Sequence, residues 1–174
     1  MNFRAGASLC KRGWIIAAAA CAAGAVVLLW PIGPALEIVN RAGATVFCTR
    51  ASAGQEFVLS FTHSVNRRPV YDTLRVERDH LVIVRSRYDS FGAGMPTDST
   101  AEGTLIVGPD GWLEWTINRP VAEITVRVGW VAGHTLTVDG RDTRLADLAE
   151  PGSPLTLRVR PVRTLDLMKG RCSP

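Results

Sequence analysis

The chain has 174 residues and a formal net charge of +4, a length sufficient for one domain with an additional N-terminal segment. The first 35 residues contain Arg4, Lys11 and Arg12 but no acidic residue, so this segment accounts for most of the net charge. The remainder is close to neutral, and a nearly neutral domain lacks the basic surface that nucleic-acid binding requires. The composition therefore predicts no nucleic-acid partner.

The N-terminal segment is expected to form a hydrophobic helix. Residues 14–30 are apolar without interruption, follow Lys11 and Arg12, and have a tryptophan at each end. At about 1.5 Å per residue, a stretch of this length just crosses the hydrocarbon core of a bilayer. Because the basic residues lie only on its N-terminal side, we expect the N-terminus in the cytoplasm and the rest of the chain outside it.

Two interpretations of this segment stay open. We favour a retained transmembrane helix, which would anchor the protein in the inner membrane with its main domain in the periplasm. A cleaved signal segment would instead release the main domain into the periplasm, although Pro34 lies among the small residues where cleavage would occur. Both interpretations predict export.

The sequence divides into three parts. Residues 1–34 hold the cytoplasmic stub with the anchor or signal, residues 35–162 the exported domain, and residues 163–174 a basic C-terminal tail. The basic residues of this end of the chain are Arg158, Arg160, Arg163, Lys169 and Arg171. A solvated face is the simpler interpretation of these charges, and attraction to anionic lipid is the alternative.

The exported part reads as a succession of short strands. The candidate segments are four to nine residues long and rich in Val, Ile, Thr, Leu and Trp. They are residues 36–40, 45–51, 56–63, 70–78, 81–88, 104–107, 112–118, 123–128, 135–138 and 155–160. Only residues 143–149 give a weak helical signal. The pattern predicts an all-β domain, an antiparallel sandwich or partly open barrel of about 8–10 short strands.

A histidine and an aspartate interrupt two of the apolar faces. In the strand 56–63 the alternation places His63 on the inward face. In the next strand, Asp72 falls among inward-facing apolar residues. Pairing the two apolar faces sets His63 opposite Val70 and Phe61 opposite Asp72, because a one-residue slip would mismatch them. His63 and Asp72 then become diagonal neighbours.

This pair has a functional and a structural interpretation. An imidazole and a carboxylate on an apolar face need each other or a ligand, since an unpaired charge there is costly. The pair is either an acid/base or anchoring dyad, in which Asp72 fixes the tautomer of His63, or a polar pair that pins the hairpin. Ser64 points to the opposite face, and no Gly-x-Ser-x-Gly motif exists, so no serine nucleophile is expected.

A glycine-rich segment is the second candidate for a site. Gly92, Gly94, Met95 and Pro96 follow the strand that ends at Tyr88. Glycine permits close backbone approach or positive φ, and proline stiffens the exit. The connection of about 15 residues is unusually long for a compact β domain, and such loops are often functional. It is either a binding loop or a shaped crossover between sheets.

The cysteines and histidines limit other chemistry. Cys48 and Cys172 are the two cysteines of the exported part. An oxidising compartment would permit a disulfide between them, and two unpaired thiols are the alternative. No Cys-x-x-Cys pair exists, and the histidines lack thiolate partners, so neither a metal site nor a cofactor is predicted.

These motifs together resemble a known family. Phe61-Thr62-His63-Ser64-Val65, Pro69-Val70-Tyr71-Asp72 and the segment from Tyr88 to Pro96 resemble the uncharacterised bacterial family catalogued as domain of unknown function eighteen-fifty. The resemblance extends over residues 36–160. Members are small exported proteins, often encoded beside TRAP-type solute transporters of the TAXI class, so it implies an accessory role with transporter subunits as partners. Where the family has glutamate, this chain has the shorter Asp72.

Three functions are compatible with these observations. We favour a non-enzymatic periplasmic domain, tethered or secreted, that binds a transporter subunit or its solute. Its binding residues would be His63, Ser64, Asp72, Tyr88, Gly92, Gly94, Met95 and Pro96. A hydrolase using His63 as a general base oriented by Asp72 is the second possibility, and it requires a cleft beside His63. The third is a purely structural protein in which the motifs determine the fold.

Overall fold

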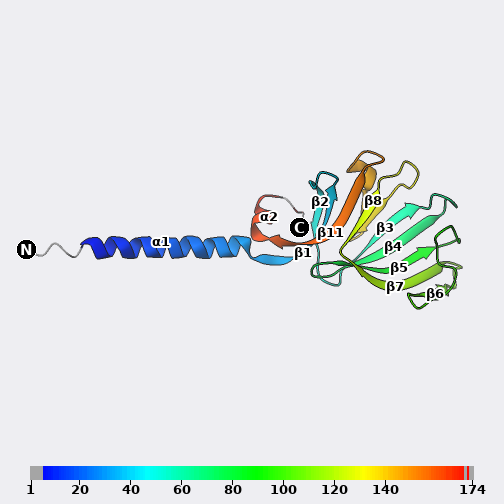
Figure 1. Cartoon of the computed structure of the whole chain (residues 1–174), viewed down its shortest axis with the longest axis horizontal. Coiled ribbons are helices and arrows are strands. Elements are labelled where there is room, and N and C mark those ends of the chain that lie inside the picture. Colours follow the sequence, from blue (N-terminus) through cyan, green and yellow to red (C-terminus); the bar gives the residue numbers. More distant parts are fainter. Residues whose placement is uncertain (1–5, 171, 173–174) are drawn as a thin grey trace, which may run out of the picture.

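The computed structural model describes residues 6–170 and residue 172. Its first element is the helix α1 (Gly6–Leu29), which extends away from the rest of the molecule as a single arm (Figure 1). Within the described part of the chain, no helix is long and apolar enough to cross a membrane, which departs from the transmembrane helix expected over residues 14–30.

The rest of the chain forms two antiparallel sheets, which confirms the all-β class. The smaller sheet has the order β2-β1-β11-β8, and the larger one the order β10-β9-β3-β4-β5-β7-β6. The strands of the smaller sheet are β1 (Pro31–Asn40), β2 (Thr45–Arg50), β8 (Glu123–Arg127) and β11 (Pro154–Arg163). Those of the larger sheet are β3 (Glu56–Thr62), β4 (Pro69–Val76), β5 (Leu81–Tyr88), β6 (Thr104–Val107), β7 (Leu113–Val121), β9 (Thr135–Val138) and β10 (Arg141–Arg144).

The two sheets enclose one main core and form a sandwich. Leu36 and Leu157 of the smaller sheet and Phe57 and Leu74 of the larger one belong to the same buried cluster. Phe57 and Leu157 alternate with less buried neighbours along β3 and β11, as expected when one face of a strand is inside. The sandwich is the arrangement that buries both apolar faces, since an open sheet would leave one of them in water.

Two predicted elements differ from the sequence expectation. Residues 143–149 do not form a helix: the strand β10 ends at Arg144, and a short 3₁₀ helix, Leu145–Asp147, follows. The residue responsible is Leu145, which is fully buried in the core and holds the segment against the sheet. The C-terminal tail is also more ordered than expected, because β11 continues into a short helix, α2 (Thr164–Met168).

The hairpin of β3 and β4 has a register two residues away from the expected one. Phe61 pairs with Val70, and Leu59 pairs with Asp72. The inward face is nevertheless the expected one, because a shift of two residues preserves the alternation of side chains. The strand β3 ends at Thr62, and the backbone of His63 then hydrogen-bonds to Arg67 and Arg68 at the turn. Hydrophobic matching thus predicted the face but not the position along it.

Candidate functional site

A pocket of about 510 Å³ lies at the end of the inner face of the larger sheet. Residues from three connections meet there: the β3–β4 turn, the β5–β6 loop and the β8–β9 loop. Six predicted residues line it, namely His63, Ser64, Asp72, Gly94, Met95 and Pro96. The structure therefore brings the histidine motif and the glycine-rich segment together, although only the sequence resemblance had linked them.

The strands explain how the floor of the pocket forms. Phe61 of β3 continues the row of core side chains that begins with Phe57 and Leu59, and it pairs with Val70 of β4. Asp72 is two residues farther along β4, on the same face as Val70. The carboxyl group of Asp72 thus interrupts the apolar row of β4, between Val70 and Leu74, at the floor of the pocket.

Asp72 forms a hydrogen bond with a serine, Ser86, rather than with a histidine. The hydroxyl of Ser86, its partner across the β4–β5 ladder, donates a hydrogen bond to the carboxylate at 2.5 Å. Burial raises the pKa of Asp72, and this hydrogen bond only partly offsets the effect. Among the residues that the structure describes, no lysine or arginine lines the pocket. The carboxylate of Asp72 is therefore held beside a hydroxyl group and apolar side chains, without a lysine or arginine partner among these lining residues.

His63 does not form the expected dyad. Its Nδ1 accepts a hydrogen bond from the backbone N–H of Val65 at 3.3 Å. Within the part of the chain that the structure describes, no hydrogen bond joins His63 to Asp72 or to a serine hydroxyl. The reason is the two-residue shift in register, which places His63 beyond the end of the strand. An acid/base pair of these two residues, as a hydrolase would need, is not formed.

Ser64 also departs from expectation. Alternation along a continuous strand would turn it away from His63, but β3 ends before both residues and the turn begins. Both side chains consequently line the pocket. Strand periodicity gives no information on side-chain direction once the strand has ended.

His134 is a pocket residue that the sequence interpretation missed. It lies just before β9, opposite Phe61, and the two rings have their centroids 5.4 Å apart. Burial lowers the pKa of His134, so its imidazole is neutral at physiological pH. The signal was present in the sequence, because His134 continues the alternate apolar positions Leu136 and Val138 of the strand. Ser86 interrupts an inward row on β5 in the same way.

The glycine-rich segment approaches the β3–β4 turn closely. A Cβ atom at Gly92 would lie 2.8 Å from Nδ2 of Asn66 and 3.2 Å from Cε1 of His63. The Asn66 amide donates hydrogen bonds to the backbone carbonyls of Ser90 and Phe91, at 3.3 and 3.2 Å. Gly92 is thus needed for contact between the two loops. It shapes the pocket without lining it.

Tyr88 holds the other end of the same loop. Its ring is fully buried beneath the pocket, and its hydroxyl donates a hydrogen bond to the carbonyl of Pro96 at 2.7 Å. Burial raises the pKa of Tyr88, so the hydroxyl stays protonated and remains a donor. Gly94 has φ +80°, which a residue with a side chain rarely adopts. Tyr88 and Gly92 therefore position the loop that supplies Gly94, Met95 and Pro96.

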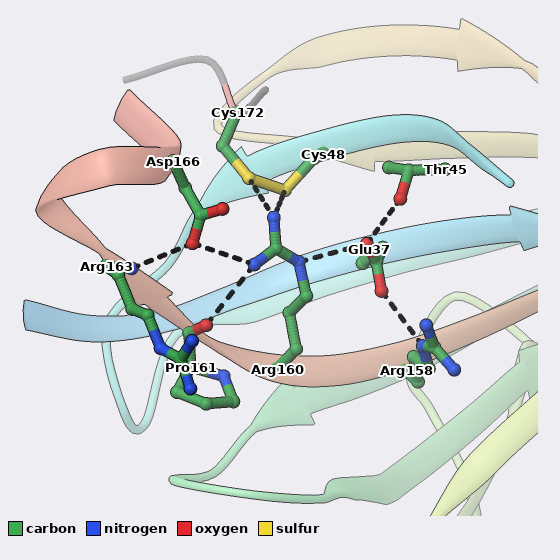
Figure 2. Close-up of a disulfide and its surroundings, with 9 residues drawn as sticks. All are labelled: Glu37, Thr45, Cys48, Arg158, Arg160, Pro161, Arg163, Asp166 and Cys172. Carbon is green, nitrogen blue, oxygen red and sulfur yellow. Dashed lines mark hydrogen bonds and ion pairs between the residues drawn. A yellow bond between two sulfur atoms is a disulfide. The ribbon is translucent and has the colours of Figure 1, made fainter. Parts of the chain in front are cut away.

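Cys48 and Cys172 lie in a second polar region, on the outer face of the smaller sheet. They form a disulfide that joins β2 to the segment after α2. Figure 2 shows the guanidinium of Arg160 between this disulfide, Glu37 and Asp166. The Glu37 carboxylate is buried and also contacts Arg158 at 2.9 Å.

This arrangement changes the interpretation of the basic C-terminal end. Arg158 and Arg160 are engaged with Glu37, so they are not simply a solvated face. No group of three or more His, Cys, Asp or Glu residues within the described chain has the geometry of a metal site. The pocket on the larger sheet is consequently the candidate functional site.

A β sandwich with a pocket between three connecting loops defines the structural class of this protein. The chain belongs to the family described as Domain of unknown function (DUF1850), which matches residues 57–145, about half of its length. Every residue that lines the pocket falls within this match. The disulfide and the smaller sheet's β1, β2 and β11 lie outside it. No curated protein and no solved structure matches the chain.

Proposed function

We propose that the protein is a non-enzymatic binding domain whose pocket holds a small molecule. The observation that carries this proposal is the composition of the pocket, in which Phe61 and Met95 provide apolar walls around the half-buried carboxyl group of Asp72. Small-molecule sites commonly have such apolar walls, a few polar groups and a volume of roughly 300–1,000 Å³.

We further propose that the domain acts outside the cytoplasm, as an accessory protein of a TRAP-type solute transporter of the TAXI class. The disulfide between Cys48 and Cys172 supports export, because such bonds persist in oxidising compartments. The chain resembles a family whose members are often encoded beside these transporters, and this resemblance supports a transporter subunit as the partner. The loops around the pocket also expose Phe91, Trp130 and Val131, which gives a transporter subunit an apolar surface to contact.

Co-purification from membranes tests the binding role. The tagged full-length chain is expected to retain a transporter subunit, and the substitution His63→Ala to reduce its recovery at least about fivefold. His80→Ala is the matched control, since His80 lies in the β4–β5 turn, at the opposite end of β4 from the pocket. There its imidazole forms a hydrogen bond with its neighbour Asp79. Equal recovery with wild type and His63→Ala would exclude this end of the sheet as the binding surface.

A further inference from the structure

The half-buried carboxylate of Asp72 has no lysine or arginine beside it among the described residues that line the pocket. Ser86 is its hydrogen-bond partner, and Leu59 is its neighbour on β3. The other ionisable side chains on this side are His63 and His134, from two loops, and the buried Tyr88 of β5, and the hydroxyls of Thr62 and Ser64 also line the pocket. A carboxylate in such surroundings is costly unless something supplies the opposite charge.

Two arginines near the pocket are engaged elsewhere. Arg87 of β5 pairs with Asp110 and lies over the ring of Trp112, with its guanidinium carbon 4.7 Å from the centroid. Arg68 of the β3–β4 turn pairs with Asp89. Neither of these arginines lines the pocket, and Arg67 of the same turn does not line it either. The protein therefore leaves the position of the countercharge open to a ligand.

The walls of the pocket favour a cation that carries an apolar body. Phe61 presents an aromatic ring, tilted by 33° against that of His134, and Met95 a polarisable thioether. Aromatic faces attract ammonium groups, and methionine adapts to apolar shapes. An anionic ligand would meet the carboxylate of Asp72 without a lysine or arginine to hold it.

We propose that the pocket binds a small organic ammonium ion, with its charged head on the carboxylate of Asp72 and its apolar body against Phe61 and Met95. This inference rests on the proposed binding function and names the chemical class of the ligand. Ser86 positions the carboxylate of Asp72, because its hydroxyl hydrogen-bonds to one carboxylate oxygen, Oδ1, and leaves the other oxygen for the ammonium group. The pocket of about 510 Å³ accommodates a single-ring amine.

Three probes that share one body and differ in charge test this inference. They are 2-phenylethylamine, 2-phenylethanol and phenylacetate, titrated into the full-length protein at pH 7.5 by calorimetry or by NMR. We expect the amine to bind at least about tenfold more tightly than the alcohol, and the carboxylate to bind most weakly. Asp72→Asn should reduce the affinity for the amine to that for the alcohol. Asp79→Asn, which alters an exposed carboxylate at the opposite end of β4, should leave the preference intact.

The pH dependence of wild-type binding provides a measurement that needs no variant. As the pH falls through the pKa of Asp72, the carboxylate becomes neutral, and affinity for the amine should fall while that for the alcohol changes little. Protonation of His63 or His134 would also repel the amine, and a remaining pH dependence in Asp72→Asn measures that contribution.

Two results would overturn the inference. Tighter binding of the alcohol or of phenylacetate would reject an ammonium ligand but would leave a small-molecule pocket in place. Absence of binding by all three probes would also reject it. The co-purification experiment with His63→Ala does not use these probes, so the proposed binding function stands or fails independently of this result.

Discussion

Asp72 should make the folded protein less stable at neutral pH than in mild acid. Burial raises its pKa in the folded state, so the folded protein holds this proton more strongly than the unfolded chain does. The stabilising contribution of the proton is complete below the pKa of an unfolded aspartate, about 3.9, and is lost as the pH rises through the folded pKa. Other carboxylates also contribute to the dependence of the free energy of unfolding on pH, so a variant is needed to isolate the contribution of Asp72.

The substitution Asp72→Asn removes this cost and keeps an acceptor for the hydroxyl of Ser86. We expect the variant to be more stable than wild type at pH 7.5, by about 1 kcal/mol, and the difference to vanish near pH 4. Urea denaturation at the two pH values measures it. Asp79→Asn is the control, because Asp79 is exposed and lies outside the pocket. A variant less stable than wild type at pH 7.5 would show that the carboxylate has an unrecognised partner.

Gly92 illustrates a steric requirement at a single residue. The Cβ of Gly92→Ala would meet the amide of Asn66 at 2.8 Å, so either the loop or the β3–β4 turn must move. We expect a loss of about 1–3 kcal/mol, as for other overpacked sites. Because the clash is with a side chain, Asn66→Ala should relieve it, and the double variant should lose less than the sum of the two single losses. Additive losses in urea denaturation would show that this contact does not constrain the pocket.

At the scale of elements, the disulfide holds the C-terminal segment on the smaller sheet. Cys48 and Cys172 are separated by 124 residues, and their side chains belong to a small buried cluster with Ala35 and Val162. Closing so long a loop restricts the unfolded chain strongly, and loss of a native disulfide typically costs about 2–5 kcal/mol.

We therefore expect Cys172→Ser to reduce the free energy of unfolding by about 2–5 kcal/mol. Dithiothreitol should have a similar effect on wild type and little on the variant. Cys21→Ser is the matched control, because Cys21 is a free and exposed cysteine of α1, and its replacement should leave stability unchanged. Equal unfolding midpoints for Cys172→Ser and Cys21→Ser would mean that the bond contributes nothing to the stability of the domain.

Local sequence patterns predicted the individual strands far better than they predicted which strands pair with one another. The strands 81–88, 104–107 and 135–138 form as the alternation indicated. The pairing of β1 with β11 joins residues more than a hundred positions apart, and no local pattern encodes such a contact. The buried Glu37 was missed for the same reason, since its partners Arg158 and Arg160 come from that distant strand.

The candidate site was predictable in its residues but not in its geometry. The inward position of Asp72 followed from alternation along its strand, and the same rule applied to Ser86 and His134 would have added both to the site. The contact between Gly92 and Asn66 depends on how two loops fold over a strand end. Such loop conformations are not periodic, so no residue pattern predicts that the two motifs lie close together. The family resemblance was the one indication that they belong to the same site.

For the whole molecule, the β sandwich should fold without the helix α1. The helix projects away from the sheets, and its end nearest the domain lies beside α2 (Figure 1). None of its described side chains belongs to a buried cluster, and the large ones, such as Trp14 and Ile16, are exposed. An arm that buries no core surface adds little to the free energy of unfolding.

A chain that begins at Pro31 should therefore keep the free energy of unfolding of the full chain to within about 0.5 kcal/mol. Guanidinium denaturation followed through the buried Trp115 compares the two chains. Removal of residues 164–174 provides the contrast: this truncation deletes Cys172 together with the Asp166 partner of Arg160 and should cost at least as much as Cys172→Ser. A loss above about 1 kcal/mol on removal of α1 alone would mean that the helix packs on the sandwich in solution, since an exposed arm has no other means of stabilising the sheets.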